Sequence, residues 1–141
     1  SPASSTTPAG SSPAAPAITR PEKGPTTELQ ADLLFAQGTA ELTAEGRARV
    51  QALAAELRAQ GDVSVVVRGY TDDDGSAAFN ISLSEERALC VRDLLLAEGL
   101  RPDRVLARGL GPRFPLDGND SAEGRARNRR ITVEVRPGST P

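Results

Sequence analysis

Histidine is missing from this chain of 141 residues, and cysteine occurs once, at position 90. Without histidine the chain can have neither imidazole catalysis nor a histidine-rich metal site. A single cysteine excludes an internal disulfide, and the apolar neighbours of Cys90 are typical of a small buried residue. No cysteine–histidine pair can form, so the commonest way of activating a thiol nucleophile is excluded.

Aromatic residues make up only 3% of the chain, and the formal net charge is −2. Few stacking side chains and no positive charge excess argue against a nucleic-acid partner. No apolar run approaches the length of a membrane span. The sequence begins with serine, so we expect a processed or excised form, in which a signal peptide or lipid anchor would precede residue 1.

Composition divides the chain into three parts. Residues 1–27 consist mainly of Ser, Thr, Pro, Ala and Gly, which cannot bury enough apolar surface to offset the entropy of ordering. We expect a disordered linker there, with an interdomain spacer as the alternative. Residues 28–136 contain the periodic apolar patterns of one folded domain, and residues 137–141 read as a disordered tail.

The folded part alternates between strand-like and helix-like patterns. Thr43 is a candidate N-cap for a helix that ends at Gly61, and the spacing of Ser82 and Glu85 suggests a capping box for a second helix that ends at Gly99. We expect strands over residues 28–35, 62–70, 104–111 and 129–136. The order β-α-β-α-β-β predicts an α+β fold, with two main helices on one face of a four-stranded mixed sheet.

The loop between the second strand and the second helix reads TDDDGS, residues 71–76. Its three aspartates do not have the spacing of an EF-hand. If Asp72 is counted as the first position, glycine is at the fourth position rather than the sixth. A weak calcium site and a pair of catalytic carboxylates remain alternatives, but consecutive aspartates on such a turn point in different directions. We therefore expect neither a metal site nor an enzyme.

A ligand clamp fits this loop better. Asp72 follows a central strand, where side chains enter the crevice at the end of the sheet, and Arg87 lies in the early turns of the next helix. A carboxylate and a guanidinium at one crevice suit a ligand that carries an ammonium and a carboxylate on one carbon. Asn80 could add amide hydrogen bonds, and Gly75 could let the backbone come close. The residues alone leave an equal alternative, in which Asp72 and Arg87 simply pair with each other.

Three motifs then resemble one known family. TDDDGSAAFNISLSEERA, residues 71–88, is similar to the core signature of the OmpA-like peptidoglycan-binding domain, TD-x-x-G-x-x-x-x-N-x-x-LS-x-x-RA. EGRARNRRI, residues 123–131, is similar to its second signature, and LLFAQGTAELTAEGR, residues 33–47, to its opening element. The resemblance covers about residues 28–136, and the three motifs occur in the family's order.

The resemblance implies a role for each matched residue. Asp72 and Arg87 would bind the free amino-acid end of meso-diaminopimelate in the stem peptide of the cell wall. Asn128, Arg129 and Arg130 would give structural support and rim contacts. The family also implies roles for other matched residues in ligand binding: Phe35, Thr71, Gly75, Asn80 and Leu83.

Two positions depart from the family pattern: Ala36, where many members have aspartate, and Tyr70, where histidine is common. One polar contact to the ligand could therefore be absent, although neither position belongs to the Asp72–Arg87 pair. The function implied is non-catalytic, non-covalent anchoring to peptidoglycan, without a cofactor, in the bacterial cell envelope. The linker would lead to an upstream membrane or envelope anchor. The alternative is a protein-interaction module of the same fold that does not bind the wall.

Overall fold

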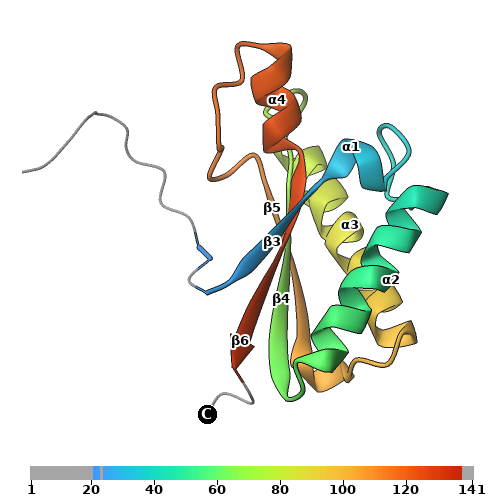
Figure 1. Ribbon diagram of the computed structural model, residues 1–141. Helices are drawn as coiled ribbons and strands as arrows, with labels where there is room; N and C mark the ends of the chain where they lie inside the picture. The colour runs from blue at the N-terminus through green and yellow to red at the C-terminus, as the bar shows by residue number, and fades with distance from the viewer. Residues whose placement is uncertain (1–20, 23, 138–141) are drawn as a thin grey trace, which may run out of the picture.

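The computed structural model describes residues 21, 22 and 24–137. Most of the expected linker (1–27) and of the expected tail (137–141) lies outside the described residues, and Pro137 is the last residue of a strand. Four strands and four helices, with one short 3-10 turn, follow each other along the described chain (Figure 1). Their bounds are β3 Thr26–Gln30, α1 Ala31–Leu34, α2 Ala44–Ala59, β4 Val63–Tyr70, α3 Ala77–Ala97, η1 Pro102–Arg104, β5 Val105–Gly111, α4 Ala122–Asn128 and β6 Arg130–Pro137.

The four strands form one mixed sheet in the order β3-β6-β4-β5. β6 is antiparallel to both β3 and β4, whereas β4 and β5 are parallel and are joined by the crossover helix α3. α2 and α3 lie together on one face of the sheet (Figure 1). The expected architecture and the central position of the second strand are therefore confirmed.

The apolar stripes expected from the sequence meet in one core between the helices and the sheet. β-branched residues of β4 and β6 supply one side of this core, and α2 and α3 supply the other. The buried core residues are Val50, Leu53, Leu57, Ala88, Val91 and Leu95 from the helices, and Val65, Val67, Ile131 and Val133 from the sheet, whereas Val135 is half-buried. This packing fixes the orientation of α3 and thus of the polar residues along it.

The first strand is shorter than expected, which corrects the prediction for residues 28–35. β3 runs from Thr26 to Gln30, and the next four residues form the single helical turn α1. The turn places Ala31 and Leu34 in the core, and the amide of Phe35 closes it by donating to the carbonyl of Ala31. Folded structure also begins two residues before Glu28, because Thr26 and Thr27 pair with β6.

α3 begins six residues earlier than the capping box at Ser82 suggested. The Ser76 side chain caps the helix by accepting from the amide of Phe79, so Ser82 lies inside the helix. Thr43 does cap α2 as expected, by accepting from the amide of Gly46. Gly61 and Gly99 each follow a helix end with φ of +86° and +111°, a region that glycine adopts without strain.

The face of the sheet opposite the helices carries a buried polar network. Arg130, Thr132 and Glu134 point to this side, as the alternation of β6 predicted, but all three are buried. Arg68 of β4 forms an ion pair with Glu134 at 2.7 Å. Glu22 accepts hydrogen bonds of 2.6 Å from the hydroxyls of Tyr70 and Thr132. The segment before β3 is therefore held on this face by Glu22.

Replacing Glu22 by glutamine tests this attachment. Burial alone would raise the pKa of Glu22, but the hydrogen bonds from Thr132 and Tyr70 outweigh it, and the net pKa is lowered. A lowered folded-state pKa stabilises the fold above the unfolded-state pKa, and this contribution is lost as the pH falls through the folded-state pKa. We expect Glu22→Gln to lower the free energy of unfolding at neutral pH by about 1–3 kcal/mol.

Urea unfolding at neutral pH and in acid, at about pH 3, measures both effects. The difference between Glu22→Gln and wild type should shrink in acid, as the pH falls towards the lowered folded-state pKa of Glu22. Glu45→Gln is the matched control, because Glu45 lies in an exposed ion pair on α2. A constant difference at both pH values would show that the ionised carboxylate of Glu22 does not hold the segment.

Candidate functional site

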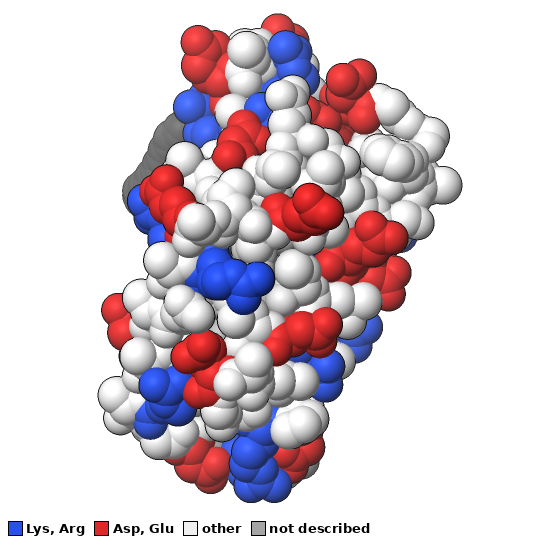
Figure 2. All heavy atoms as spheres, turned by 90° about the vertical axis from the view of Figure 1, so that its right-hand side faces the viewer, with Lys and Arg blue, Asp and Glu red and all other residues white. Residues whose placement is uncertain are grey.

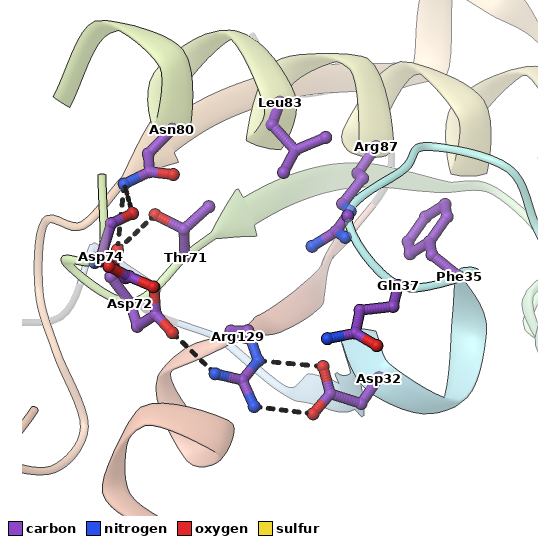
Figure 3. A pocket seen from close by; sticks show the side chains of 11 residues that line it. Asp32, Phe35, Gln37, Thr71, Asp72, Asp74, Asn80, Leu83, Arg87 and Arg129 are labelled. Carbon is purple, nitrogen blue, oxygen red and sulfur yellow. Dashed lines mark hydrogen bonds and ion pairs between the residues drawn. The ribbon is translucent and has the colours of Figure 1, made fainter. Parts of the chain in front are cut away.

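A pocket of about 500 Å³ opens at the end of the sheet where β4 finishes. It is bounded by α1 and the loop after it, by the loop between β4 and α3, by the first half of α3, and by the residue that follows α4 (Figure 3). Its lining residues are Asp32, Phe35, Gln37, Gly38, Thr71, Asp72, Asp74, Asn80, Leu83, Arg87 and Arg129. Polar side chains predominate, and both members of the expected clamp are among them.

Asp72 is held in place from both sides. One carboxylate oxygen, Oδ1, accepts a 3.1 Å hydrogen bond from the amide of Asp74, and the other, Oδ2, forms a 2.6 Å ion pair with Arg129 Nη1. The preceding residue, Thr71, donates from its hydroxyl to the Asp72 carbonyl and from its amide to the Gly111 carbonyl. Asp72 is therefore buried as a paired, fixed carboxylate rather than a mobile one.

Arg129 joins two carboxylates across the mouth of the pocket. Besides Asp72, it contacts Asp32 of α1 through two parallel hydrogen bonds of 2.9 Å (Figure 3). The hydrogen bond from Arg129 lowers the pKa of Asp32, which therefore stays ionised, and the pKa of Arg129 is raised, with the bond to Asp32 as the main cause. The site thus contains a three-residue bridge: carboxylate, guanidinium, carboxylate.

Arg87 enters the pocket from α3 with most of its side chain buried. Its Nε donates to the carbonyl of Thr39 at 2.8 Å, and its guanidinium lies 5.2 Å from the centre of the Phe35 ring. Burial lowers the pKa of Arg87, and the negative charge of Asp32 partly opposes this shift. Within the described part of the chain, the terminal nitrogens Nη1 and Nη2 of Arg87 donate to no protein acceptor, and Figure 3 shows them facing the pocket.

The structure decides between the two arrangements that the sequence left open for Asp72 and Arg87. They line the same pocket, but the ion-pair partner of Asp72 is Arg129. The alternative in which Asp72 and Arg87 simply pair with each other is therefore wrong. The terminal nitrogens Nη1 and Nη2 of Arg87 face the cavity, where they could bind a ligand anion.

The remaining expected site residues divide into two groups. Asn80 and Leu83 of α3 line the pocket, as do Phe35 and Thr71. The side-chain amide of Asn80 donates to the carbonyls of Asp74 at 2.9 Å and Asp72 at 3.4 Å, so it also shapes the aspartate loop.

Gly75 and Arg130 do not reach the pocket, and this corrects their placement in it. Gly75 has φ of +92°, and a β-carbon added to it would meet no atom within 4 Å. Its role is therefore to adopt the left-handed backbone conformation that the turn requires. Arg130 is fully buried, with its guanidinium 3.8 Å from the centre of the Tyr70 ring and Nη2 donating to the Phe114 carbonyl. Asn128 gives the expected support, since its oxygen accepts from the amides of Leu116 and Asp117.

Neither of the two residues that depart from the family pattern lines the pocket. Tyr70 turns its hydroxyl away to Glu22, and Ala36 is not part of the lining. The next residue, Gln37, does line the pocket and offers a polar side chain beside the missing carboxylate. Sequence reasoning missed Gln37, together with Asp32, Gly38 and Asp74; only the position of Gln37 next to the expected Phe35 could have indicated it.

Two features of the described residues bear on other functions. No group of three or more acidic or cysteine side chains there is arranged to hold a metal ion. None of the helices described is both long and apolar enough to pass through a membrane. On the face formed by α2 and α3, acidic and basic side chains are interspersed rather than gathered into one basic area (Figure 2).

Comparisons with known proteins agree on one family. The model of the OmpA family matches residues 34–129. The chain is 37% identical over 107 residues to outer membrane protein A of Bordetella avium, covering 76% of this chain and 55% of that protein. It is 36% identical over 123 residues to the peptidoglycan-binding protein ArfA of Mycobacterium tuberculosis, covering 82% of this chain and 38% of that protein.

Solved structures show the same relationship. The cell wall anchor of the T6SS from Pseudomonas aeruginosa superposes with a TM-score of 0.72 at 32% identity, covering 81% of each chain. The chain spans about half or less of the length of the two curated relatives, so the match concerns one domain of those proteins. With the family model, the relatives and the fold in agreement, this chain belongs to the OmpA family.

Proposed function

We propose that this domain binds peptidoglycan without catalysis, by holding the free amino-acid end of meso-diaminopimelate between Asp72 and Arg87. The observation that carries the proposal is that the terminal nitrogens of Arg87, which donate to no acceptor among the described residues, face a pocket that the carboxylates of Asp72 and Asp32 also line. A ligand that presents a carboxylate to Arg87 and an ammonium to Asp72 satisfies both charges at once.

The charges of the lining favour a zwitterion over a simple ion. Three aspartates and two arginines line the pocket, so positive and negative groups face each other across it. A lone anion would meet Asp72 and Asp32, and a lone cation would meet Arg87 and Arg129, with repulsion in both cases. An amino-acid end group can place each of its two charges beside a group of opposite charge in the pocket.

Arg129 has a positioning role in this proposal. It holds Asp72 and Asp32 with fixed geometry, so the acceptors of the ammonium are oriented before the ligand arrives. Its charge also lies within the pocket, where it adds to the attraction on the ligand carboxylate. Removal of Arg129 would leave two neighbouring carboxylates to repel each other and would disorder the site.

The relatives support a wall-binding role. ArfA is named a peptidoglycan-binding protein, and the Pseudomonas aeruginosa structure is described as a cell wall anchor. We infer that this chain acts in the bacterial cell envelope, with the Pro/Ala/Ser-rich residues 1–27 joining the domain to an upstream membrane or envelope element. The alternative, a protein-interaction module of the same fold, predicts no affinity for isolated wall.

Calorimetric titration of the full chain with meso-diaminopimelate tests the proposal, with Nα-acetyl-L-lysine amide as the control. The control keeps the ε-amine but has no free carboxylate and so no amino-acid end. Saturable heat with the first ligand and none with the second is the expected result. If neither ligand bound and the chain also failed to sediment with insoluble cell wall, the proposal would be wrong. Release of soluble wall fragments over time would instead indicate an enzyme.

Amidation of the ligand provides a further prediction. Converting the bound carboxylate to a carboxamide removes the negative charge that faces Arg87 and leaves a neutral hydrogen bond in its place. We expect the affinity to fall by about tenfold, the difference between a charge-assisted and a neutral hydrogen bond. Calorimetry with the diamide of meso-diaminopimelate, in which neither end keeps a carboxylate, measures this change. Equal affinity for both forms would contradict a direct contact between Arg87 and that carboxylate.

A further inference from the structure

A second hollow adjoins the pocket, and no residue role assigned so far uses it. It has a volume of about 620 Å³ and lies between the loop after α1 and the first turns of α3. Gly38 and Leu83 line both cavities, so the two cavities lie next to each other. The other residues around the second hollow are Thr39, Ala40, Glu41, Phe79, Ser82 and Glu86.

Phe79 is the most unusual residue of this hollow. Its side chain is 60% exposed, the largest exposed fraction among the large apolar side chains of the described residues. It lies in the first turn of α3, on the exposed stretch before the buried Asn80. An exposed phenylalanine beside a polar pocket supplies apolar contact area that the fold itself does not use.

The hollow combines an apolar floor with an acidic rim. Phe79, Leu83 and Ala40 provide the apolar surface, and Glu41 and Glu86 are exposed carboxylates on opposite sides. No lysine or arginine lines it. A group with a free carboxylate would therefore be repelled, whereas a neutral amide with a small apolar side chain could pack on the ring and donate its N–H to a carboxylate.

We propose that this second hollow receives the neutral, amide-linked residue that follows the diamino acid in the same peptide, and that it disfavours a free carboxylate there. The proposal rests on the function proposed above and extends it from one end group to the adjoining peptide. Three methylenes separate the two α-carbons of meso-diaminopimelate. Its peptide end is therefore separated from the bound end, and the hollow next to the first pocket at Gly38 and Leu83 can receive the residue attached to it.

Three synthetic probes test the proposal by calorimetry on the full chain. The first is free meso-diaminopimelate; the second carries D-alanine amide on one end; the third carries D-alanine with a free carboxylate in the same place. The second should bind about three- to fivefold more tightly than the first, because one methyl group and an amide become buried on Phe79. The third should bind more weakly than the second.

Two variants assign these differences to named residues. Phe79→Ala should remove the gain from D-alanine amide and leave the affinity for free meso-diaminopimelate unchanged. Glu86→Gln should bring the acid and amide probes closer together. Leu106→Ala is the matched control, because Leu106 is a 46% exposed apolar residue on β5, which lines neither cavity. Both variants concern exposed side chains, so the fold should be retained.

The outcomes separate the two proposals. Binding of free meso-diaminopimelate without any gain from D-alanine amide would overturn the second hollow and leave the first site standing. Equal losses of affinity for all three probes in Phe79→Ala would also overturn it, since they would show a structural role for the ring. Absence of binding by all three probes, together with failure of the chain to sediment with insoluble cell wall, would overturn both proposals.

Discussion

Replacing Arg87 by alanine should lower the affinity for meso-diaminopimelate by at least about 100-fold. Two charge-assisted hydrogen bonds from its terminal nitrogens would be lost, each contributing about 1.5–3 kcal/mol. The pocket would also keep its aspartates with one positive charge fewer, which disfavours the ligand carboxylate. Calorimetry measures the affinity, and sedimentation with insoluble cell wall measures binding to the polymer.

The fold should survive this substitution. Among the described residues, Arg87 makes one hydrogen bond, to the Thr39 carbonyl, and one contact with the Phe35 ring, so we expect a loss of stability of about 1–2 kcal/mol. Arg87→Lys keeps the charge but lacks the planar fork, and should recover only part of the affinity. Arg49→Ala, an exposed arginine on α2, is the matched control. Undiminished binding by Arg87→Ala would exclude Arg87 as the contact of the carboxylate.

The second large effect is expected at Gly69, where α3 crosses β4 in direct backbone contact. A β-carbon added at Gly69 would lie 2.3 Å from the carbonyl oxygen of Ser84, a distance that forces the helix away from the sheet. We expect Gly69→Ala to lower the free energy of unfolding by about 3 kcal/mol or more, as for severe overpacking. Arg87 lies one turn beyond Ser84 on α3, so the same displacement should also weaken ligand binding.

Gly61→Ala separates steric overlap from backbone strain. Gly61 has φ of +86°, but no atom lies within 4 Å of the β-carbon that alanine would add. Its expected cost is therefore only the left-handed conformation, about 1 kcal/mol. Chemical denaturation of the two variants gives both values. If Gly69→Ala were no more destabilising than Gly61→Ala, the close contact between α3 and β4 would not require glycine at position 69.

Local sequence patterns predicted the elements whose signals are local. β4 is a run of β-branched residues, and Thr43 is followed by an apolar stripe, so both were placed correctly. Residues 31–34 were assigned to a strand because one helical turn is too short to show a period of 3.6. Ser82 and Glu85 have the spacing of a capping box, but the structure shows that Ser76 is the residue at the N-terminus of the helix.

In the candidate site, too, the residues with a local sequence signal were predicted, and those without one were missed. Asp72 and Arg87 were found because each has a defined place relative to the end of a strand or the start of a helix. The contact of Arg129 with Asp32 joins residues 97 positions apart, and no local pattern contains that information. The different fates of Arg129 and Arg130 could have been inferred, because neighbouring residues at the start of a strand point to opposite sides of the sheet.

The pairing of β3 with β6 has a mechanical consequence if the wall and an upstream tether pull on the domain from its two ends. Thr26 pairs with Glu134 near the middle of β6, and Gln30 pairs with Arg130 at the end beside the pocket. A force between the tether and the bound ligand would thus run along β3. The hydrogen bonds of an antiparallel ladder are perpendicular to its strands, so they would share this load in shear rather than open one after another.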